Sequence, residues 1–206
     1  MKILVTGGLG YIGSHVTVLL LQKGHEVISV DNLFNSSIDV LKGIEDITGK
    51  RPHFEAFDVT DENQMIFLFD KYPNIEGVIH FAAYKSVGES VSEPLKYYEN
   101  NITGLVQILK LVVKSSIPFI FSSSCTVYGQ ADEMPINEEM KLKKPFSPYG
   151  NTKQTGEQII VDCCNAYKGF SAILLRYFNP IGAHSSAKIG EFHQGIPQNL
   201  IPFLTQ

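Results

Sequence analysis

The sequence predicts an α/β protein in which helices cover both faces of a doubly wound parallel sheet. Short runs rich in Val, Ile and Phe alternate with longer segments of helical periodicity along most of the chain. The short runs are almost continuously apolar, as are strands that are buried on both faces of a parallel sheet. Hydrophobic residues make up 44% of the 206 residues and charged residues 18%, so the chain can bury a sizeable core.

The predicted strands and helices follow one another in a regular order. We expect strands at residues 2–6, 26–31, 53–59, 77–83, 118–124 and 172–178. We expect helices between them at residues 14–23, 38–48, 61–71, 94–115 and 151–168. Gly24 is a suitable stop for the first helix, and Pro94 is a suitable start for the fourth. The alternation ends after Asn179, so we expect one domain over residues 1–180 and the beginning of another over residues 181–206.

Charge and composition exclude several classes of protein. The net charge is −4, and the only basic cluster, Lys141, Lys143 and Lys144, is typical of a solvated loop rather than of a nucleic-acid interface. No apolar run reaches the roughly 18 residues that span a bilayer, and the start of the chain lacks a signal-peptide pattern. The three cysteines form no CxxC pair, and the six histidines show no short ligand spacing. We therefore expect a cytoplasmic protein without a membrane span or a metal site.

A glycine-rich segment, TGGLGYIGSH at residues 6–15, lies between the first predicted strand and the first predicted helix. Gly8, Gly10 and Gly13 fit the spacing GxGxxG, and Gly7, Gly10 and Gly13 fit GxxGxxG. Either spacing places backbone N–H groups and a helix N-terminus where a pyrophosphate can be held. The segment therefore predicts dinucleotide binding.

Acidic residues end the second and third predicted strands. Asp31 lies 18 residues after Gly13, where a carboxylate can accept hydrogen bonds from the ribose hydroxyls of an adenine nucleotide. The following residues, 32–36, contain no Arg or Lys that could bind a 2′-phosphate, so NAD is favoured over NADP. By the same logic, Asp58 is placed to meet the adenine edge.

The candidate catalytic residues are Tyr149 and Lys153, which lie four residues apart at the start of a predicted helix. This spacing places both side chains on one helix face. The preceding strand ends in FSSSCTVYG and brings Ser124 to the carboxyl edge of the sheet, where ligands bind in this architecture. With Tyr149 as base, Lys153 as the neighbouring cation and Ser124 orienting a substrate hydroxyl, the group suits proton removal coupled to hydride transfer.

A tyrosine has a pKa of about 10 in water and needs help to act as a base near neutral pH. Lowering the pKa by about three units requires roughly 4 kcal/mol of differential stabilisation. A lysine ammonium and a positively charged nicotinamide ring next to the phenol could together supply it.

Eight segments, in order along the chain, resemble motifs of the extended short-chain dehydrogenase/reductases and, within them, of the UDP-glucose 4-epimerases. They are TGGLGYIGSH, DNL at Asp31, HFAAYKSVGES at residues 80–90, YYENN at 97–101, FSSSCTVYG, SPYGNTK, LLRYFNPIGAH at 174–184 and GIPQNL at 195–200. The resemblance implies a Rossmann fold over residues 1–180 and a nucleotide-sugar lobe that begins at residue 181. The 206 residues correspond to the N-terminal portion of that family's chains.

The resemblance also implies roles for particular residues. The implied NAD contacts are Gly7, Gly10, Tyr11, Ile12, Gly13, Asp31, Asn32, Asn35, Ser36, Asp58, Val59, Phe81, Ala82, Lys85, Asn100, Lys153 and Phe178. Ser124, Tyr149 and Lys153 are implied as catalytic residues. Contacts to the nucleotide sugar are implied for Ser124, Tyr149, Asn179 and Asn199.

The implied activity is the interconversion of UDP-galactose and UDP-glucose by transient hydride transfer from C4 to bound NAD⁺ through a 4-keto intermediate. Related dehydratases use an Asp-Glu pair just before VYG, where this chain has Cys125 and Thr126. Neither a thiol nor a threonine hydroxyl replaces that pair at neutral pH. Two alternatives remain open, a non-catalytic NAD-binding module and a 4-epimerase of N-acetylated UDP-hexoses. The resemblance further implies a homodimer formed through the helices at 94–115 and 151–168, and we expect the 206 residues alone to be inactive.

Overall fold

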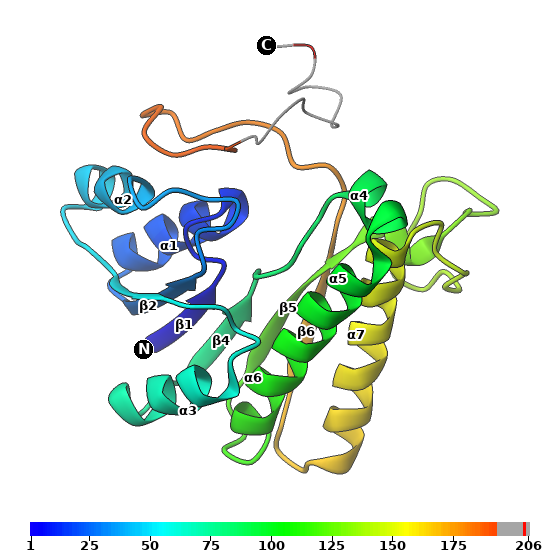
Figure 1. The fold of residues 1–206 in the computed structure, drawn as a ribbon, viewed down its shortest axis with the longest axis horizontal. Helices are drawn as coiled ribbons and strands as arrows, with labels where there is room; N and C mark the ends of the chain where they lie inside the picture. Colours follow the sequence, from blue (N-terminus) through cyan, green and yellow to red (C-terminus); the bar gives the residue numbers. More distant parts are fainter. Residues whose placement is uncertain (193–203, 205–206) are drawn as a thin grey trace.

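The computed structural model describes residues 1–192 and residue 204. Over this part of the chain, six parallel strands form one sheet in the order β3-β2-β1-β4-β5-β6 (Figure 1). The strands are β1 (Lys2–Thr6), β2 (Glu26–Asp31), β3 (His53–Ala56), β4 (Gly77–His80), β5 (Phe119–Ser124) and β6 (Ala172–Tyr177). The strand order reverses between β1 and β4, so the predicted doubly wound parallel sheet is confirmed.

Helices cover the two faces of the sheet. They are α1 (Tyr11–Gln22), α2 (Val40–Thr48), α3 (Glu62–Lys71), α4 (Val87–Ser92), α5 (Pro94–Tyr98), α6 (Gly104–Val112) and α7 (Pro148–Ala166), with a π-helical turn η1 (Glu99–Thr103) and a 3₁₀ turn η2 (Cys125–Tyr128). Val18 of α1 and Leu41 of α2 pack with Val5 of β1 in one apolar cluster. Ile108 of α6 and Ile160 of α7 belong to a second cluster, together with residues of α3 and of the strands. The α1–α2 pair and the α3–α6–α7 group thus lie on opposite sides of the sheet (Figure 1).

Local signals set the starts of the helices. The Asp61 carboxylate accepts a hydrogen bond from the Gln64 N–H at 3.1 Å and caps α3. The Ser147 hydroxyl accepts one from the Gly150 N–H at 3.1 Å and caps α7, with Pro148 at the first helical position. With Ser147 as its cap, α7 begins at Pro148, three residues before the predicted start at residue 151. Tyr149 therefore lies in the first turn of this helix.

The helix predicted at residues 94–115 is not a single α-helix. It begins at Pro94 as predicted, widens into η1 and continues as α6 to Val112, while α4 precedes it unpredicted. The wide turn places Asn101 inside the protein, where its side chain bonds to the backbone of Tyr84. The apolar residues Leu105, Ile108 and Leu109 of α6 are buried.

Two of the six strands are less buried than predicted. Both β3 and β6 are edge strands, and β3 ends at Ala56, three residues before the predicted end. On β6, Leu174 packs on the α7 side of the sheet, whereas Ile173 and Leu175 point to the opposite face and are 57% and 37% exposed. An apolar run predicts a strand but does not tell whether neighbouring elements cover both of its faces.

Within the described part of the chain, no helix combines the length and the apolar character needed to cross a bilayer. The same part of the chain holds no group of three or more His, Cys, Asp or Glu side chains placed to bind a metal ion.

Candidate active site

The glycine segment forms the turn between β1 and α1 at the carboxyl edge of the sheet. Gly7 has a φ of +65°, which a residue with a side chain rarely adopts. A Cβ at Gly13 would lie 2.1 Å from the Gly7 carbonyl oxygen, so the first turn of α1 sits directly on the loop. Helix α1 begins at Tyr11, and the first N–H groups of a helix have no partner within the helix. The turn is therefore a cradle for an anion such as a pyrophosphate.

Asp31 at the end of β2 holds this loop in place. One of its carboxylate oxygens accepts a hydrogen bond from the Leu9 N–H at 3.1 Å. The other accepts bonds from the Leu33 N–H at 3.0 Å and the Ser36 hydroxyl at 2.8 Å. A carboxylate has about four acceptor positions, so three internal bonds still leave room for a ribose hydroxyl. The sequence prediction for Asp31 omitted its role in fixing the glycine loop.

Asp58 follows β3 and bonds to the segment after β2. Its side chain accepts hydrogen bonds from the Asn32 amide at 2.7 Å and from the Thr60 backbone and hydroxyl at 2.9 and 2.8 Å. Burial raises the pKa of Asp58, but the hydrogen bonds outweigh burial and hold the pKa below its ordinary value. The two predicted cofactor-binding acids thus lie on neighbouring strands of the same sheet edge.

The residues after β4 lie against the glycine loop. The Phe81 N–H donates to the Thr6 carbonyl at 3.0 Å, and the Ala82 N–H donates to the Thr6 hydroxyl at 3.4 Å. A Cβ at Gly7 would lie 2.7 Å from the Ala82 nitrogen, so this close approach also requires glycine. The side chain of Val59, another predicted contact, is buried next to Gly104.

Residues 182–191 cross back over this edge. The Tyr11 hydroxyl donates to the Gly182 carbonyl, and the Lys85 ammonium pairs with the Glu191 carboxylate at 2.6 Å. Burial and the nearby Glu191 carboxylate raise the pKa of Tyr11. Two of the predicted cofactor contacts, Tyr11 and Lys85, are therefore tied to one crossing segment.

Ser124, Tyr149 and Lys153 are brought together as predicted. Ser124 ends β5, while Tyr149 and Lys153 lie one turn apart at the start of α7. The Lys153 ammonium lies 5.9 Å from the centre of the Tyr149 ring and donates to the Ser122 carbonyl at 2.8 Å. The Ser124 hydroxyl lies close enough to the Tyr149 phenol to lower the pKa of the phenol. The sheet edge thus offers a hydroxyl, a phenol and an ammonium in one place.

The pKa values of this group depend mainly on burial. Lys153 is only 4% exposed, and burial lowers its pKa to about 8. Burial raises the pKa of Tyr149, and the nearby Ser124 hydroxyl lowers it by less. The expected lowering of the Tyr149 pKa by Lys153 is therefore not seen in the protein alone, and any further lowering has to come from a cation that binds beside the phenol.

Cys125 and Thr126 stand where related dehydratases carry the Asp-Glu pair that assists the elimination of water. The Thr126 N–H and hydroxyl donate to the Ser124 hydroxyl at 3.2 and 3.0 Å. Burial raises the pKa of the adjacent Cys125 thiol, which keeps the thiol protonated at neutral pH. Both residues support Ser124 rather than supplying an acid and a base.

Sequence reasoning missed several residues that shape the site. The Asn101 amide donates to the Thr152 hydroxyl at 3.0 Å, and Asn100, a predicted cofactor contact, donates to the Asn101 side chain at 2.9 Å. His80 is buried between Thr6 and Phe121, and burial lowers its pKa to about 3. His80 lies inside the predicted strand at 77–83 and Asn101 at the end of the YYENN segment, but neither position indicates these contacts.

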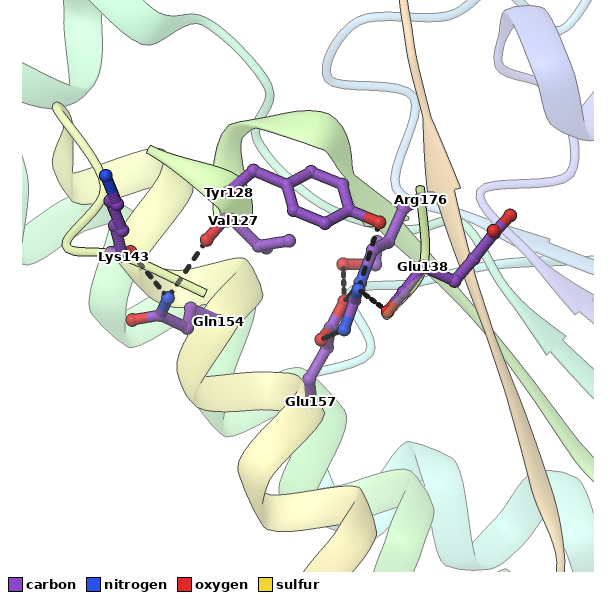
Figure 2. A network of polar contacts seen from close by, with 8 residues as sticks. Val127, Tyr128, Glu138, Lys143, Gln154, Glu157 and Arg176 are labelled. Carbon is purple, nitrogen blue, oxygen red and sulfur yellow. Dashed lines mark hydrogen bonds and ion pairs between the residues drawn. The ribbon is translucent and has the colours of Figure 1, made fainter. Parts of the chain in front are cut away.

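A second unpredicted group is a pair of charged residues next to the candidate catalytic residues. Arg176 of β6 binds the buried carboxylate of Glu157 on α7 and lies beside Tyr128 (Figure 2). The arginine belongs to the RYF run of the last predicted strand. Periodicity alone did not show that its side chain points toward α7.

Two predicted residues, Phe178 and Asn179, are not assembled with the others. Phe178 and Asn179 follow β6 at the same edge of the sheet, but both are exposed. Asn199 lies outside the described residues. Asn35 is half-buried in the loop after β2.

The strand order, the glycine turn at the switch between β1 and β4, and the acid at the end of β2 define a Rossmann-type protein with a dinucleotide cradle. Residues 3–205 match the model of the NAD dependent epimerase/dehydratase family. The chain belongs to that family.

Individual relatives agree with this assignment. The chain is 47% identical over 206 residues to the UDP-glucose 4-epimerase of Neisseria meningitidis serogroup A and 43% identical over 212 residues to that of Mus musculus. Both alignments include all of this chain and only 60% and 61% of those proteins, so the chain spans about three fifths of their length.

Solved structures give the same result. The chain resembles the UDP-glucose-4-epimerase of Stenotrophomonas maltophila with bound NAD and formylated UDP-arabinopyranose at a TM-score of 0.95 and 44% identity, over 100% of this chain and 61% of that one. It resembles the UDP-glucose 4-epimerase of Bifidobacterium longum in complex with NAD+ and UDP at a TM-score of 0.95 and 47% identity, over 99% of this chain and 61% of that one.

Proposed function

We propose that this chain binds NAD and carries the redox groups of a UDP-glucose 4-epimerase, which interconverts UDP-galactose and UDP-glucose. The observation that carries the proposal is the meeting of Ser124, Tyr149 and Lys153 at the sheet edge that also holds the glycine cradle. The relatives at 43–47% identity support it, since they are UDP-glucose 4-epimerases and span this chain completely.

The residues fit an NAD molecule. Close packing at Gly7 and Gly13 holds the loop tightly against Ala82 and the first turn of α1, whose first N–H groups can bind a diphosphate. Asp31 keeps an acceptor position for a ribose hydroxyl. We infer that the remaining predicted contacts hold the same molecule, with Asn32, Asn35, Ser36, Asp58 and Val59 on its adenine side and Phe81, Ala82, Lys85, Asn100 and Phe178 toward its nicotinamide. When bound, NAD⁺ supplies a hydride acceptor and a positive ring.

The side chains of the site handle the proton. Tyr149 accepts the proton of the sugar C4 hydroxyl as that carbon is oxidised, and Ser124 holds the oxygen in place by a hydrogen bond. With the positive ring of NAD⁺ beside the phenol, the phenolate form of Tyr149 would be stabilised, while the neighbouring Lys153 ammonium would help to hold the cofactor. When the 4-keto sugar is reduced on its other face, Tyr149 returns the proton, so the net reaction is an isomerisation. Asn179 and Asn199 are proposed to contact the nucleotide sugar.

We propose the same division of the chain as above, with residues 1–180 as the cofactor domain and residues 181–206 as the start of the sugar lobe. We further propose a cytoplasmic homodimer. Apolar side chains on α4 and α5 support the dimer, because Val91 and Leu95 are 63% and 79% exposed on helices that pack beside α7. We expect the 206 residues alone to bind NAD without turning over the sugar.

Two measurements test the proposal. Calorimetry should show that the chain binds NAD more tightly than NADP. The protein translated from the entire reading frame should convert UDP-galactose to UDP-glucose, and Tyr149→Phe should abolish the conversion while NAD remains bound. NAD binding without conversion of any UDP-hexose would favour a non-catalytic module. A preference for UDP-N-acetylglucosamine over UDP-glucose in competition would favour the N-acetylated substrates.

A further inference from the structure

Arg176 connects β6 to the middle of α7 through Glu157 (Figure 2). Its Nε and Nη2 donate to the two carboxylate oxygens of Glu157 at 2.9 and 2.8 Å, which is a bidentate pair. Its Nη1 donates to the Tyr128 hydroxyl at 3.0 Å, and the guanidinium carbon lies 4.9 Å from the centre of the Tyr128 ring. The arginine is thus held in one orientation by groups from two other elements.

Glu157 is a buried carboxylate on the same face of α7 as Lys153. It is 4% exposed, and besides Arg176 it accepts a hydrogen bond from the Ser123 hydroxyl at 2.5 Å. A buried carboxylate without a partner is costly, so Glu157 needs a cation within the protein. Ser123 precedes the catalytic Ser124, which places this carboxylate directly behind the reacting groups.

Lys153 and Glu157 lie four residues apart on α7, the spacing at which a lysine and a glutamate form an ion pair on a helix. Both side chains are 4% exposed and therefore share one buried environment. The two charges are nevertheless directed to different partners. The Lys153 ammonium donates to the Ser122 carbonyl at 2.8 Å, whereas Glu157 faces Arg176.

We propose that Arg176 is a positioning residue for the active site, which holds both oxygens of Glu157 and so prevents this carboxylate from capturing the Lys153 ammonium. Lys153 then stays at the end of β5 beside Tyr149. The value of this arrangement for catalysis rests on the proposed function. The competition between Arg176 and Lys153 for one carboxylate depends only on the residues of this chain.

The other titratable groups near Lys153 do not compete for it. From β4, His80 is neutral at neutral pH, since burial lowers its pKa to about 3. From η2, burial keeps the Cys125 thiol protonated, and Tyr128 is a partner of Arg176. From α5, the Tyr98 hydroxyl accepts a hydrogen bond from the Asn151 amide, and on α7 itself the half-buried Tyr149 is a neutral phenol because its pKa is raised. Glu157 is therefore the anion that can draw Lys153 away from Tyr149.

The test follows the titration of Lys153 by NMR in protein labelled with ¹³C at the lysine Cε, with Lys153→Met to assign the signal. In the wild-type chain Lys153 should titrate with a pKa of about 8. In Arg176→Met, pairing with the unmasked Glu157 carboxylate should raise that pKa by about one unit or more. In the double variant Arg176→Met/Glu157→Gln, which has no carboxylate to capture the lysine, the pKa should return to the wild-type value.

A merely structural role for Arg176 predicts another pattern. Both variants would then be destabilised, and Lys153 would titrate as in the wild type in each, which would overturn the proposal. An equal shift in both variants would overturn it as well. If Arg176→Met does not fold, Arg176→Gln keeps hydrogen-bond donors without the charge and should show the same rise. Because the titration needs no NAD, its outcome is separate from the proposed function, whose failure would appear as a wild-type chain that does not bind NAD.

Discussion

Replacing Gly13 by alanine tests the cradle most severely. The new Cβ would lie 2.1 Å from the Gly7 carbonyl oxygen and 2.9 Å from the Gly8 Cα. A normal contact requires about 3.5 Å, so the loop has to move by more than about 1 Å. Gly7 cannot yield easily, because its N–H donates to the Val30 carbonyl at 2.7 Å and its Cα faces the backbone of Ala82.

The expected loss has two parts. Overpacking of this kind costs about 1–3 kcal/mol of folding free energy. A loop shift of about 1 Å also takes backbone donors out of hydrogen-bonding range of a diphosphate, and two such bonds to a charged group are worth about 1.5–3 kcal/mol each. We therefore expect Gly13→Ala to raise the Kd for NAD about 10²- to 10⁴-fold.

Isothermal titration calorimetry with NAD measures the affinity, and urea unfolding measures the stability. Gly49→Ala is the control, because a Cβ at Gly49 would meet nothing within 4 Å, so that only its positive φ of +68° opposes the substitution. The control should lose about 1 kcal/mol of stability and keep the wild-type Kd. If Gly13→Ala binds NAD as tightly as the wild type, the cofactor phosphates do not lie on this loop.

Two further predictions concern single polar side chains. Asn101→Ala should lower the free energy of unfolding in urea by about 2–4 kcal/mol. The substitution leaves the Tyr84 N–H without its acceptor at 2.9 Å and removes the hydrogen bond to the Thr152 hydroxyl at 3.0 Å. The control Asn63→Ala, at an exposed position, should stay within about 0.5 kcal/mol of the wild type, and equal losses in both variants would refute the role of Asn101. The pKa of Asp58 is lowered in the folded state, so its contribution to stability is present above the unfolded pKa of about 3.9 and is lost as the pH falls through the folded pKa. The wild type should therefore be more stable than Asp58→Asn at pH 6, and this difference should shrink below pH 4; a difference independent of pH would contradict the assignment.

Much of the fold followed from local signals in the sequence. The apolar runs identified all of the strands in the described sheet, and Pro94 and the glycine segment marked helix starts, because these depend on nearby residues. The π-helical turn at 99–103 did not follow, since it depends on a tertiary contact between Asn101 and the backbone of Tyr84. The exposed face of β6 could not be foreseen either, because coverage of a strand is decided by distant elements.

The site was predictable where a motif has a fixed geometry. The turn of glycines, Asp31 and the four-residue spacing of Tyr149 and Lys153 all express local geometry and were located correctly at one sheet edge. Arg176 and Glu157 were missed, since they meet only when β6 lies beside α7. The raised pKa of Tyr149 in the protein alone was not foreseen, because it depends on burial, which is not visible in a local motif.

The most direct test of the central claim is the pKa of Tyr149 with and without NAD, followed by NMR of protein labelled with ¹³C at the tyrosine Cζ and assigned with Tyr149→Phe. The claim places the positive ring of the cofactor beside this phenol, so saturating NAD should lower the Tyr149 pKa from its raised value in the protein alone. An unchanged pKa while NAD is bound would place the nicotinamide elsewhere and contradict the account.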